Sequence, residues 1–130
     1  MIEIRGDYRP SNDELNRLNE VVWDHDHHYR DYGPTLDRSL GYICAFKGSE
    51  IVGFVNVAWD GGGHAFILDT CVIPSERRQG IASQMIGAAV ALAKKRGACW
   101  LHVDYEPHLQ GLYEGCGFRS TKAGLIDLTK

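Results

Sequence analysis

The stretch Val72-Ile73-Pro74-Ser75-Glu76-Arg77-Arg78-Gln79-Gly80-Ile81-Ala82 decides the fold, because an apolar strand ends in it and an apolar helix begins. Gly80 and Ala82 remove side-chain bulk at the start of that helix. The first amides of a helix lack intrahelical acceptors and lie at the positive end of its dipole, so they attract anions. Arg77 and Arg78 add positive charge, and a guanidinium fork matches phosphate oxygens. These residues predict a diphosphate-binding loop, with a plain turn carrying solvated arginines as the alternative.

The segments that follow this loop complete a strand–helix–strand unit. Apolar residues recur on two sides of the helix that starts at Ile81, which predicts deep packing against a sheet. The segment from Cys99 to Val103 is expected to be the next strand, and it is too apolar for an exposed sheet edge. The unit from Ile67 to Val103 is therefore predicted to be a right-handed parallel crossover.

The last part of the chain is predicted to be a short helix and a β-hairpin. Pro107 begins the helix, which carries Tyr113 and stops at Gly115-Cys116-Gly117. Phe118 starts a β segment, and Leu125 to Leu128 is expected to be its return strand.

The residues before the loop predict a strand, a helix and an antiparallel meander. Ile2 and Ile4 alternate with polar residues, and Ser11 with Glu14 forms a capping box. The polar segment 23–40 is expected to be a loop or a weak helix. Three antiparallel strands are expected at residues 42–46, 51–59 and 64–73. The whole order predicts one domain over residues 1–130, of the mixed α/β (α+β) class, with a mostly antiparallel sheet flanked by helices.

Composition narrows the class of protein. The net charge of −3 and pI near 6 argue against a nucleic-acid binder that relies on a broad positive field. No apolar run approaches the roughly 18–20 residues of a membrane span, and the N-terminus does not resemble a signal peptide. The four cysteines are widely spaced, which is typical of reduced thiols and predicts a cytoplasmic protein.

Two motifs resemble the GNAT superfamily of N-acetyltransferases. Arg77-Arg78-Gln79-Gly80-Ile81-Ala82 fits the family signature R/Q-x-x-G-x-G/A, and Val72-Ile73-Pro74 fits its strand-end pattern V-x-P. Downstream, Leu112-Tyr113-Glu114-Gly115-Cys116-Gly117-Phe118 is similar to the family's aromatic-Tyr-Glu-x-x-Gly-Phe segment. The spacing agrees, and the predicted order of elements covers essentially the whole chain. The resemblance implies the GNAT fold and acetyl-CoA as co-substrate.

The resemblance also implies roles for individual residues. The backbone of Cys71, Val72 and Ile73 would pair with the pantetheine arm of the cofactor. The amides of Arg78, Gln79, Gly80, Ile81 and Ala82 would hold the pyrophosphate, with Arg77 nearby. Tyr113 would act as the acid that protonates the departing thiolate. The chain departs from the family at Glu106 and Leu109, where an asparagine and an alanine are common.

The general base is less sharply defined by the sequence. An amine attacks a thioester only as the free base, so its proton must be removed. Asp69 is the first candidate, because it precedes Cys71 by two residues and is expected to share its face of the strand. His64, His102, Asp104 and a water-mediated route remain alternatives.

The cluster Asp24-His25-Asp26-His27-His28 contains metal-ligand types, but His25 and His28 lack the His-x₃-His spacing. It is interpreted as a polar loop at the acceptor entrance, and no metal is predicted.

The sequence thus predicts an acetyl-CoA-dependent N-acetyltransferase. The acetyl group would move to a primary amine, either a small molecule or an amino terminus, by direct attack in a ternary complex. The alternative is a non-catalytic acyl-CoA-binding regulatory module. Neither nucleic acid nor membrane is expected as a partner, and a homodimer is left open.

Overall fold

The computed structural model describes residues 1–23 and 27–130. Its strands are β1 (Ile2–Arg5), β2 (Gly41–Lys47), β3 (Glu50–Trp59), β4 (His64–Val72) and β5 (Trp100–His102). Its α-helices are α1 (Asn12–Trp23), α2 (Gly33–Arg38), α3 (Ile81–Lys95) and α4 (Gln110–Gly115). Short 3₁₀ turns occupy Pro74–Glu76 and Pro107–Leu109. Within these residues, the helices are too short or too polar to cross a membrane.

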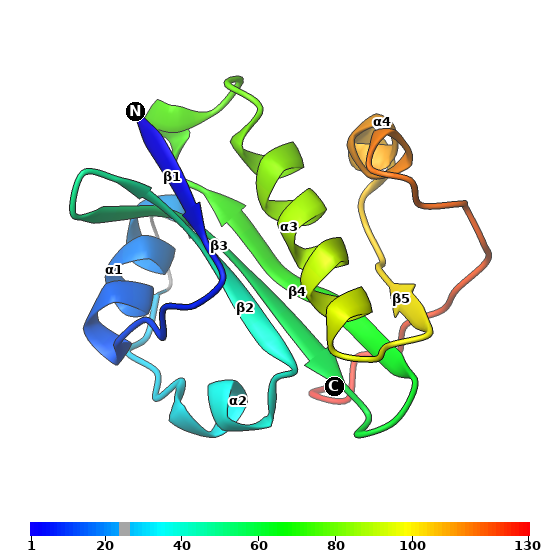
Figure 1. Ribbon diagram of the computed structural model, residues 1–130. Coiled ribbons are helices and arrows are strands. Elements are labelled where there is room, and N and C mark those ends of the chain that lie inside the picture. The colour runs from blue at the N-terminus through cyan, green and yellow to red at the C-terminus, as the bar shows by residue number, and fades with distance from the viewer. Residues whose placement is uncertain (24–26) are drawn as a thin grey trace.

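The strands form one mixed sheet in the order β1-β2-β3-β4-β5 (Figure 1). The first four strands pair antiparallel, and β5 pairs parallel with β4. The predicted meander and the parallel crossover through α3 are therefore confirmed. This crossover places the start of α3 at the end of β4, where the predicted phosphate loop lies.

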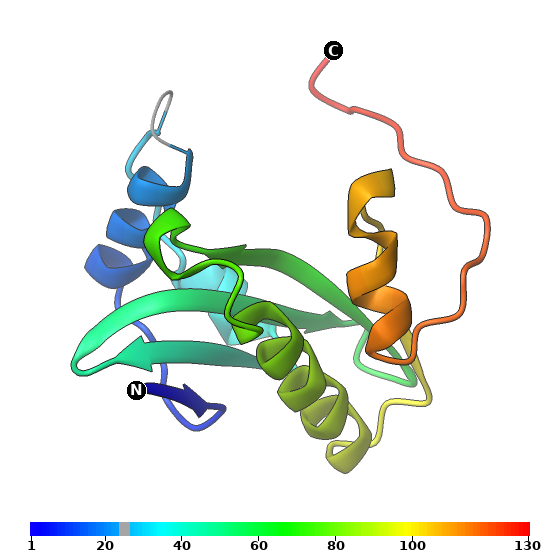
Figure 2. The same ribbon diagram turned by 90° about the horizontal axis from the view of Figure 1, so that it is seen from above.

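Helices cover both faces of the sheet, α3 on one side and α1 with α2 on the other (Figure 2). On the α3 side, Val55, Val57 and Ile86 are fully buried in one core cluster. On the other side, Leu15 and Phe54 belong to a second cluster. Burial of an aliphatic or Phe side chain stabilises the fold by about 1.5–3 kcal/mol, so the two clusters hold the helices firmly on the sheet.

The start of α1 follows the predicted capping box. The Ser11 hydroxyl accepts the amide of Glu14 at 3.1 Å, and the Glu14 carboxylate accepts the amide of Ser11 at 2.9 Å. The Tyr8 hydroxyl donates to the same carboxylate at 2.8 Å. Two amides at the start of the helix are thereby satisfied, which fixes α1 against the sheet.

Two expectations at the C-terminal side of the sheet are wrong. β5 is an edge strand, and the Trp100 side chain is 60% exposed. The hairpin expected from Phe118 to Leu128 does not form, and residues 119–130 are all exposed and form no strand. Both differences have one cause, since a β-prone segment becomes a strand only when it pairs with a neighbour. Here residues 119–130 pair with no strand in the described part of the chain, and β5 stays at the edge of the sheet.

Candidate active site

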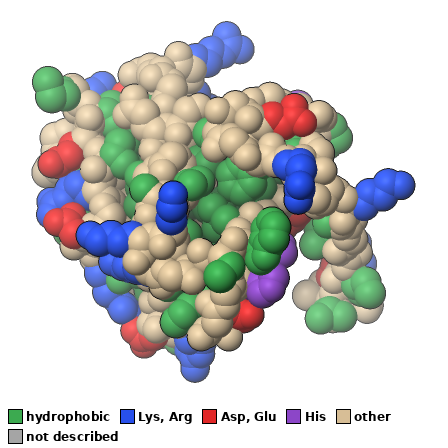
Figure 3. Space-filling view, turned by 45° about the vertical axis from the view of Figure 1, so that its right-hand side comes forward, with side chains coloured by type: hydrophobic (Ala, Val, Ile, Leu, Met, Phe, Trp, Pro, Cys, Tyr) green, Lys and Arg blue, Asp and Glu red, His purple; other side chains and the backbone are tan. Residues whose placement is uncertain are grey.

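The centre of the site is the point where β4 separates from β5. The two strands pair from His64 opposite Trp100 to Phe66 opposite His102. Beyond Phe66, the edge of β4 that faces β5 has no partner strand among the described residues. A row of backbone groups on one side of β4 is therefore open to a ligand. Figure 3 shows hydrophobic side chains lining a hollow in the middle of this side of the molecule, with lysine and arginine side chains around it.

A bulge in β4 lies within this open stretch. Phe54 is opposite Cys71 and Asn56 is opposite Leu68, so Asp69 and Thr70 together oppose a single residue of β3. Asp69 has a left-handed φ of 59°. An extra residue interrupts the alternation of faces, and the sequence-based argument for the position of Asp69 assumed an unbroken alternation.

Asp69 nevertheless lies near Cys71, on the side of the sheet that carries α1 and α2. Burial, with a contribution from the Asp69 carboxylate, raises the pKa of the Cys71 thiol to about 12. Burial likewise raises the pKa of Tyr32, with a contribution from Asp69. The Thr70 hydroxyl is buried and has no hydrogen-bond partner among the described residues. Sequence reasoning missed Thr70; a polar Asp-Thr pair inside an apolar strand was the available signal.

The predicted phosphate loop connects β4 to α3 in an open, glycine-dependent conformation. Gly80 is the N-cap of α3, with a left-handed φ of 79°, and no side chain caps the helix. The first hydrogen bond of the α3 backbone runs from the Gln84 amide to the Gly80 carbonyl, at 3.1 Å. The amides of Ile81, Ala82 and Ser83 precede it and therefore lack helical acceptors. A Cβ on Gly80 would meet nothing within 4 Å, so the space in front of these amides is open.

Side chains of the loop tie it to the strands. The Nε of Arg77 donates to the Val72 carbonyl at 2.9 Å. Glu76 is buried and its carboxylate pairs with the Lys47 ammonium at 3.1 Å. The Gln79 amide donates to the same carboxylate at 3.4 Å. Arg77 is therefore a brace for the loop as well as a positive charge beside it.

The backbone of the three residues named for the pantetheine arm is not equally free. The Ile73 amide donates to the Val52 carbonyl at 2.9 Å, and its own carbonyl accepts the Glu76 amide. Because backbone groups of successive strand residues point to opposite edges, the amide of Val72 points to the open edge. Val72 is thus the best placed of the three to meet a ligand, whereas the groups of Ile73 are occupied.

Tyr113 lies on α4 and belongs to the core cluster that also contains Val72 at the end of β4. The residue is only 4% exposed, and its ring stacks on Tyr105 at 4.9 Å and meets the edge of Phe118. Burial and the two ring contacts therefore fix the position of the Tyr113 ring. Glu106 caps the 3₁₀ turn before α4 and Leu109 ends it, and the Leu109 amide donates to the Glu106 carbonyl.

The other candidates for the general base, His64, His102 and Asp104, lie where β4 and β5 pair or just after β5. The Nδ1 of His64 and the Nε2 of His102 lie 2.8 Å apart at the start of the β4–β5 pair. The His102 ring also stacks on Phe66, and Asp104 is exposed beyond β5. In the metal-type cluster, residues 24–26 lie outside the described residues. Residues 1–23 and 27–130 contain no group of three metal-ligand side chains.

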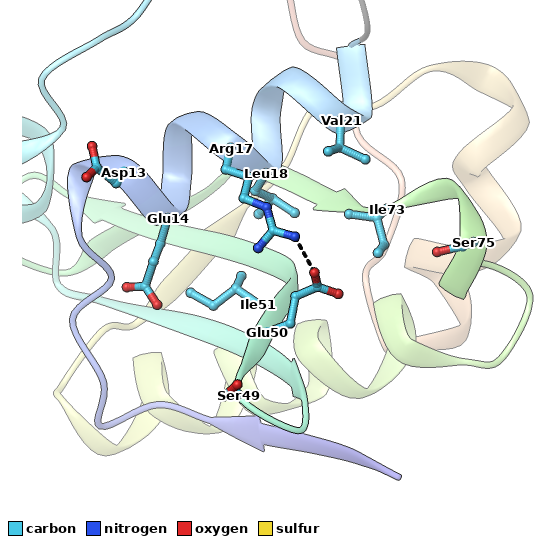
Figure 4. Close-up of a pocket in the computed structure, with 10 residues that line it drawn as sticks. All are labelled: Asp13, Glu14, Arg17, Leu18, Val21, Ser49, Glu50, Ile51, Ile73 and Ser75. Atoms are coloured by element: carbon cyan, nitrogen blue, oxygen red, sulfur yellow. Dashed lines mark hydrogen bonds and ion pairs between the residues drawn. The ribbon is translucent and has the colours of Figure 1, made fainter.

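A hollow of about 420 Å³ lies between α1, the β2–β3 turn and the residues after β4 (Figure 4). Arg17 and Glu50 form an ion pair in it, and Asp13, Glu14 and Ile73 contribute to its lining. Asp69, Gly80 and Tyr113 do not line it. The predicted site residues Asp69, Gly80 and Tyr113 therefore belong to the region where β4 separates from β5 and not to this hollow.

These features fit the elongated, anionic shape of acetyl-CoA. The open amides at the start of α3 suit a pyrophosphate, and the free edge of β4 suits the amide-containing pantetheine arm. The Thr70 hydroxyl, which is buried and has no hydrogen-bond partner among the described residues, lies on β4 between the phosphate loop and the part of β4 that pairs with β5.

Comparison with known proteins points the same way. Residues 5–118 match the model of the "Acetyltransferase (GNAT) family". The chain is 31% identical over 102 residues to the chloroplastic GCN5-related N-acetyltransferase 6 of Arabidopsis thaliana, covering 72% of this chain and 35% of that protein. The chain spans about a third of the length of the curated relatives it matches.

Solved structures share the fold across nearly the whole chain. A GNAT-family acetyltransferase from Streptococcus pneumoniae TIGR4 superposes with a TM-score of 0.77 at 24% identity, covering 98% of this chain and 99% of that one. AAC(6')-Iy in complex with the bisubstrate analogue CoA-S-monomethyl-acetylneamine superposes with a TM-score of 0.73 at 19% identity, covering 98% and 97%.

Proposed function

The chain belongs to the acetyltransferase (GNAT) family, and we propose that it transfers the acetyl group of acetyl-CoA to a primary amine by direct attack in a ternary complex. The observation that carries the proposal is the uncapped start of α3. There Gly80, at φ 79°, leaves the first amides of a fifteen-residue helix open at the end of a half-unpaired strand. Helix-terminal amides and an unpaired strand edge are complementary to a pyrophosphate followed by two amide groups.

The proposed binding mode assigns the chain's own groups as follows. The amides from Arg78 to Ala82 hold the pyrophosphate, and Arg77 braces the loop through its bond to Val72. Val72 presents the open strand edge to the pantetheine arm, and Cys71, whose backbone lies toward β3, flanks it. The Val72 amide is the donor for the negative charge that develops on the thioester oxygen during attack.

Proton transfer needs one group on each side of the thioester. Asp69, exposed on the bulge, receives the amine proton directly or through a water. Tyr113, packed on α4, donates a proton to the departing thiolate. Cys71 is not a nucleophile in this scheme, because a thiol with a pKa of about 12 is almost entirely protonated near neutral pH.

The acceptor is proposed to be a cationic amine, either a small molecule or an amino terminus. Support comes from the chain's excess of acidic over basic residues, seventeen against fourteen, and from the exposed carboxylate of Asp69. Opposite charge raises the local concentration of such an acceptor.

A non-catalytic acyl-CoA-binding module is the second candidate, because Glu106 replaces an asparagine common in the family. Initial rates measured with acetyl-CoA and the amine both varied distinguish the schemes. Intersecting double-reciprocal lines are expected for a ternary complex. Parallel lines would indicate a covalent acyl-enzyme, and tight CoA binding without turnover over a broad amine panel would indicate the module.

A further inference from the structure

A group of aromatic, histidine and leucine side chains lies at the surface where β4 pairs with β5. The Nδ1 of His64 is 2.8 Å from the Nε2 of His102, and the His102 ring stacks on Phe66 with the ring centroids 4.8 Å apart. Trp100 is opposite His64 in the strand register and is 60% exposed, and Leu68 is 42% exposed. These five residues are called the ring patch below. Large apolar side chains that gather on a surface mark a binding site more often than chance placement does.

The ring patch lies on the face of the sheet that carries α1 and α2. Ala65 and Ile67 are buried in the core cluster of the α3 side. The β4 residues of the patch alternate with these two, so their side chains point to the opposite face. The register of β5 with β4 puts Trp100 and His102 on that same face. In Figure 2 this face is uppermost, and β4 runs there between the end of α1 and the C-terminal segment.

The ring patch begins beside Asp69, the residue proposed to receive the proton of the attacking amine. Leu68 directly precedes Asp69 in the chain. Burial raises the pKa of Tyr32, with a contribution from the Asp69 carboxylate, and Tyr32 belongs to the core cluster of the α1 side. Asp69 therefore acts on the face of the sheet that holds the patch. In the other direction along β4, Cys71 is buried in the cluster beneath α1, so an acceptor bound at Asp69 extends along this strand toward the patch.

The chemistry of the ring patch suits an aromatic group. Phe66 and Trp100 offer apolar ring surface, and each contact between aromatic rings changes affinity by about two- to tenfold. A second positive charge finds a less suitable surrounding here. The Asp60 carboxylate, which lies next to His64, already accepts the amides of Gly62 and His64 at 2.7 and 3.3 Å. The patch therefore favours an acceptor with one amine and an uncharged ring over an acceptor with charges at both ends.

The spacing of the residues along β4 sets the length of the acceptor. A strand rises by about 3.3 Å per residue, so Phe66 lies about 10 Å from Asp69 along the strand, with Leu68 between them. An extended chain of single bonds places the ring of phenylbutylamine about 7 Å from its nitrogen. With the nitrogen at Asp69, that ring lies over Leu68 and reaches the stacked pair of Phe66 and His102. Butylamine carries the same charge but has no ring to place there.

We propose that the ring patch binds the body of the acceptor, and that the acceptor is a primary amine whose nitrogen is joined through a short alkyl chain to an aromatic group. This inference rests on the proposed function, because the role of Asp69 fixes where the nitrogen lies.

Nuclear magnetic resonance of the ¹⁵N-labelled chain tests the binding without turnover, because amide shifts report both affinity and place. Phenylbutylamine is expected to bind about tenfold more tightly than butylamine and than the linear diamine of similar length. The shifted amides are expected in residues 64–69 and 100–102. Equal affinities would overturn the proposal, and so would tighter binding of the diamine, which would indicate recognition by carboxylates such as Asp60 and Asp104. Shifts centred on Ile51 and Ile73 would place the amine in the hollow beside α1 and would also overturn it.

Variants then identify the side chains that recognise the ring. Phe66→Thr and Trp100→Thr each remove a ring and keep a residue that favours a strand. Each is expected to weaken phenylbutylamine binding by about fivefold and to leave butylamine binding within about twofold of the parent. Trp59→Thr is the matched control, because Trp59 is 40% exposed and opposite Ala65, on the other face of the sheet. The control should bind both amines like the parent. Unchanged phenylbutylamine binding in both patch variants, or an equal loss for the two amines, would contradict recognition by the rings.

Turnover separates the failure of this inference from the failure of the proposed function. With saturating acetyl-CoA, kcat/KM for phenylbutylamine is expected to exceed that for butylamine by about tenfold, and Phe66→Thr should remove most of this advantage. Acetyl transfer to both amines at equal kcat/KM would leave the proposed function standing and refute the role of the ring patch. Binding of phenylbutylamine at the patch without transfer to any amine would support the patch and refute the proposed function.

Discussion

Replacement of Gly80 by valine tests the phosphate loop, and the structure supplies a matched control at the other end of α3. Gly80 and Gly97 both have left-handed φ angles, 79° and 93°, and a Cβ at either position meets nothing within 4 Å. Each substitution therefore costs conformational strain without a clash, about 1–2 kcal/mol of unfolding free energy. For a chain of 130 residues this corresponds to a fall in Tm of about 4–8 °C in both variants.

The two variants should differ in their affinity for CoA. A side chain at Gly80 stands in front of the open helix amides, and each charge-assisted hydrogen bond lost there costs about 1.5–3 kcal/mol. Loss of one or two such bonds lowers affinity by about 100-fold, equivalent to about 2.7 kcal/mol. Gly97→Val, at the opposite end of the helix, should bind CoA like the parent. Isothermal titration calorimetry measures both affinities below the Tm of either variant. A folded Gly80→Val protein within threefold of the parent affinity would refute the assignment and leave the loop as a simple turn.

Three further predictions follow from individual contacts. Tyr113→Phe keeps the stacked ring and removes the hydroxyl, so kcat should fall by about 10²-fold with little change in CoA affinity; a rate within threefold of the parent would leave Tyr113 as packing only. Arg77→Ala removes the hydrogen bond to the Val72 carbonyl and a positive charge, so CoA affinity should fall by about tenfold. The loss should be smaller at high salt. An unchanged affinity would contradict both roles of Arg77. Burial raises the pKa of Cys44 and Cys71 from 9.0 to about 12, so the native state keeps both thiols protonated and the free energy of unfolding should fall between about pH 9 and 12. Urea unfolding of the Cys44→Ala and Cys71→Ala double variant should show a smaller loss of unfolding free energy over this pH range than the parent. An equal loss would contradict this origin.

Much of the fold follows from local patterns. The Ser11–Glu14 capping box, the two apolar stripes of α3 and the length of its crossover all depend on residues close in sequence. Such signals predict an element whatever surrounds it. The predicted parallel pairing of β4 and β5 also follows, since a helix such as α3 between two neighbouring strands is the usual connection of a parallel pair.

The features that escaped prediction depend on pairing between distant segments. The bulge at Asp69 exists because β3 offers one residue opposite two of β4, and no period in the β4 sequence reports that count. The contact between His64 and His102 follows from the register of β4 with β5. The segment from Arg119 onward has strand-like residues but pairs with no strand in the described part of the chain, so the sequence pattern predicted a hairpin that does not form.

The central claim is that this site moves an acetyl group from CoA to an amine. The most direct test is the rate of CoA thiol release from acetyl-CoA, measured across a panel of cationic amines, with mass spectrometry of the amine in the same reaction. We predict thiol release that rises with amine concentration and saturates, together with one acetyl group gained by the amine for each CoA released. Thiol release that is independent of every amine, or no release from a protein that binds acetyl-CoA tightly, would contradict the account.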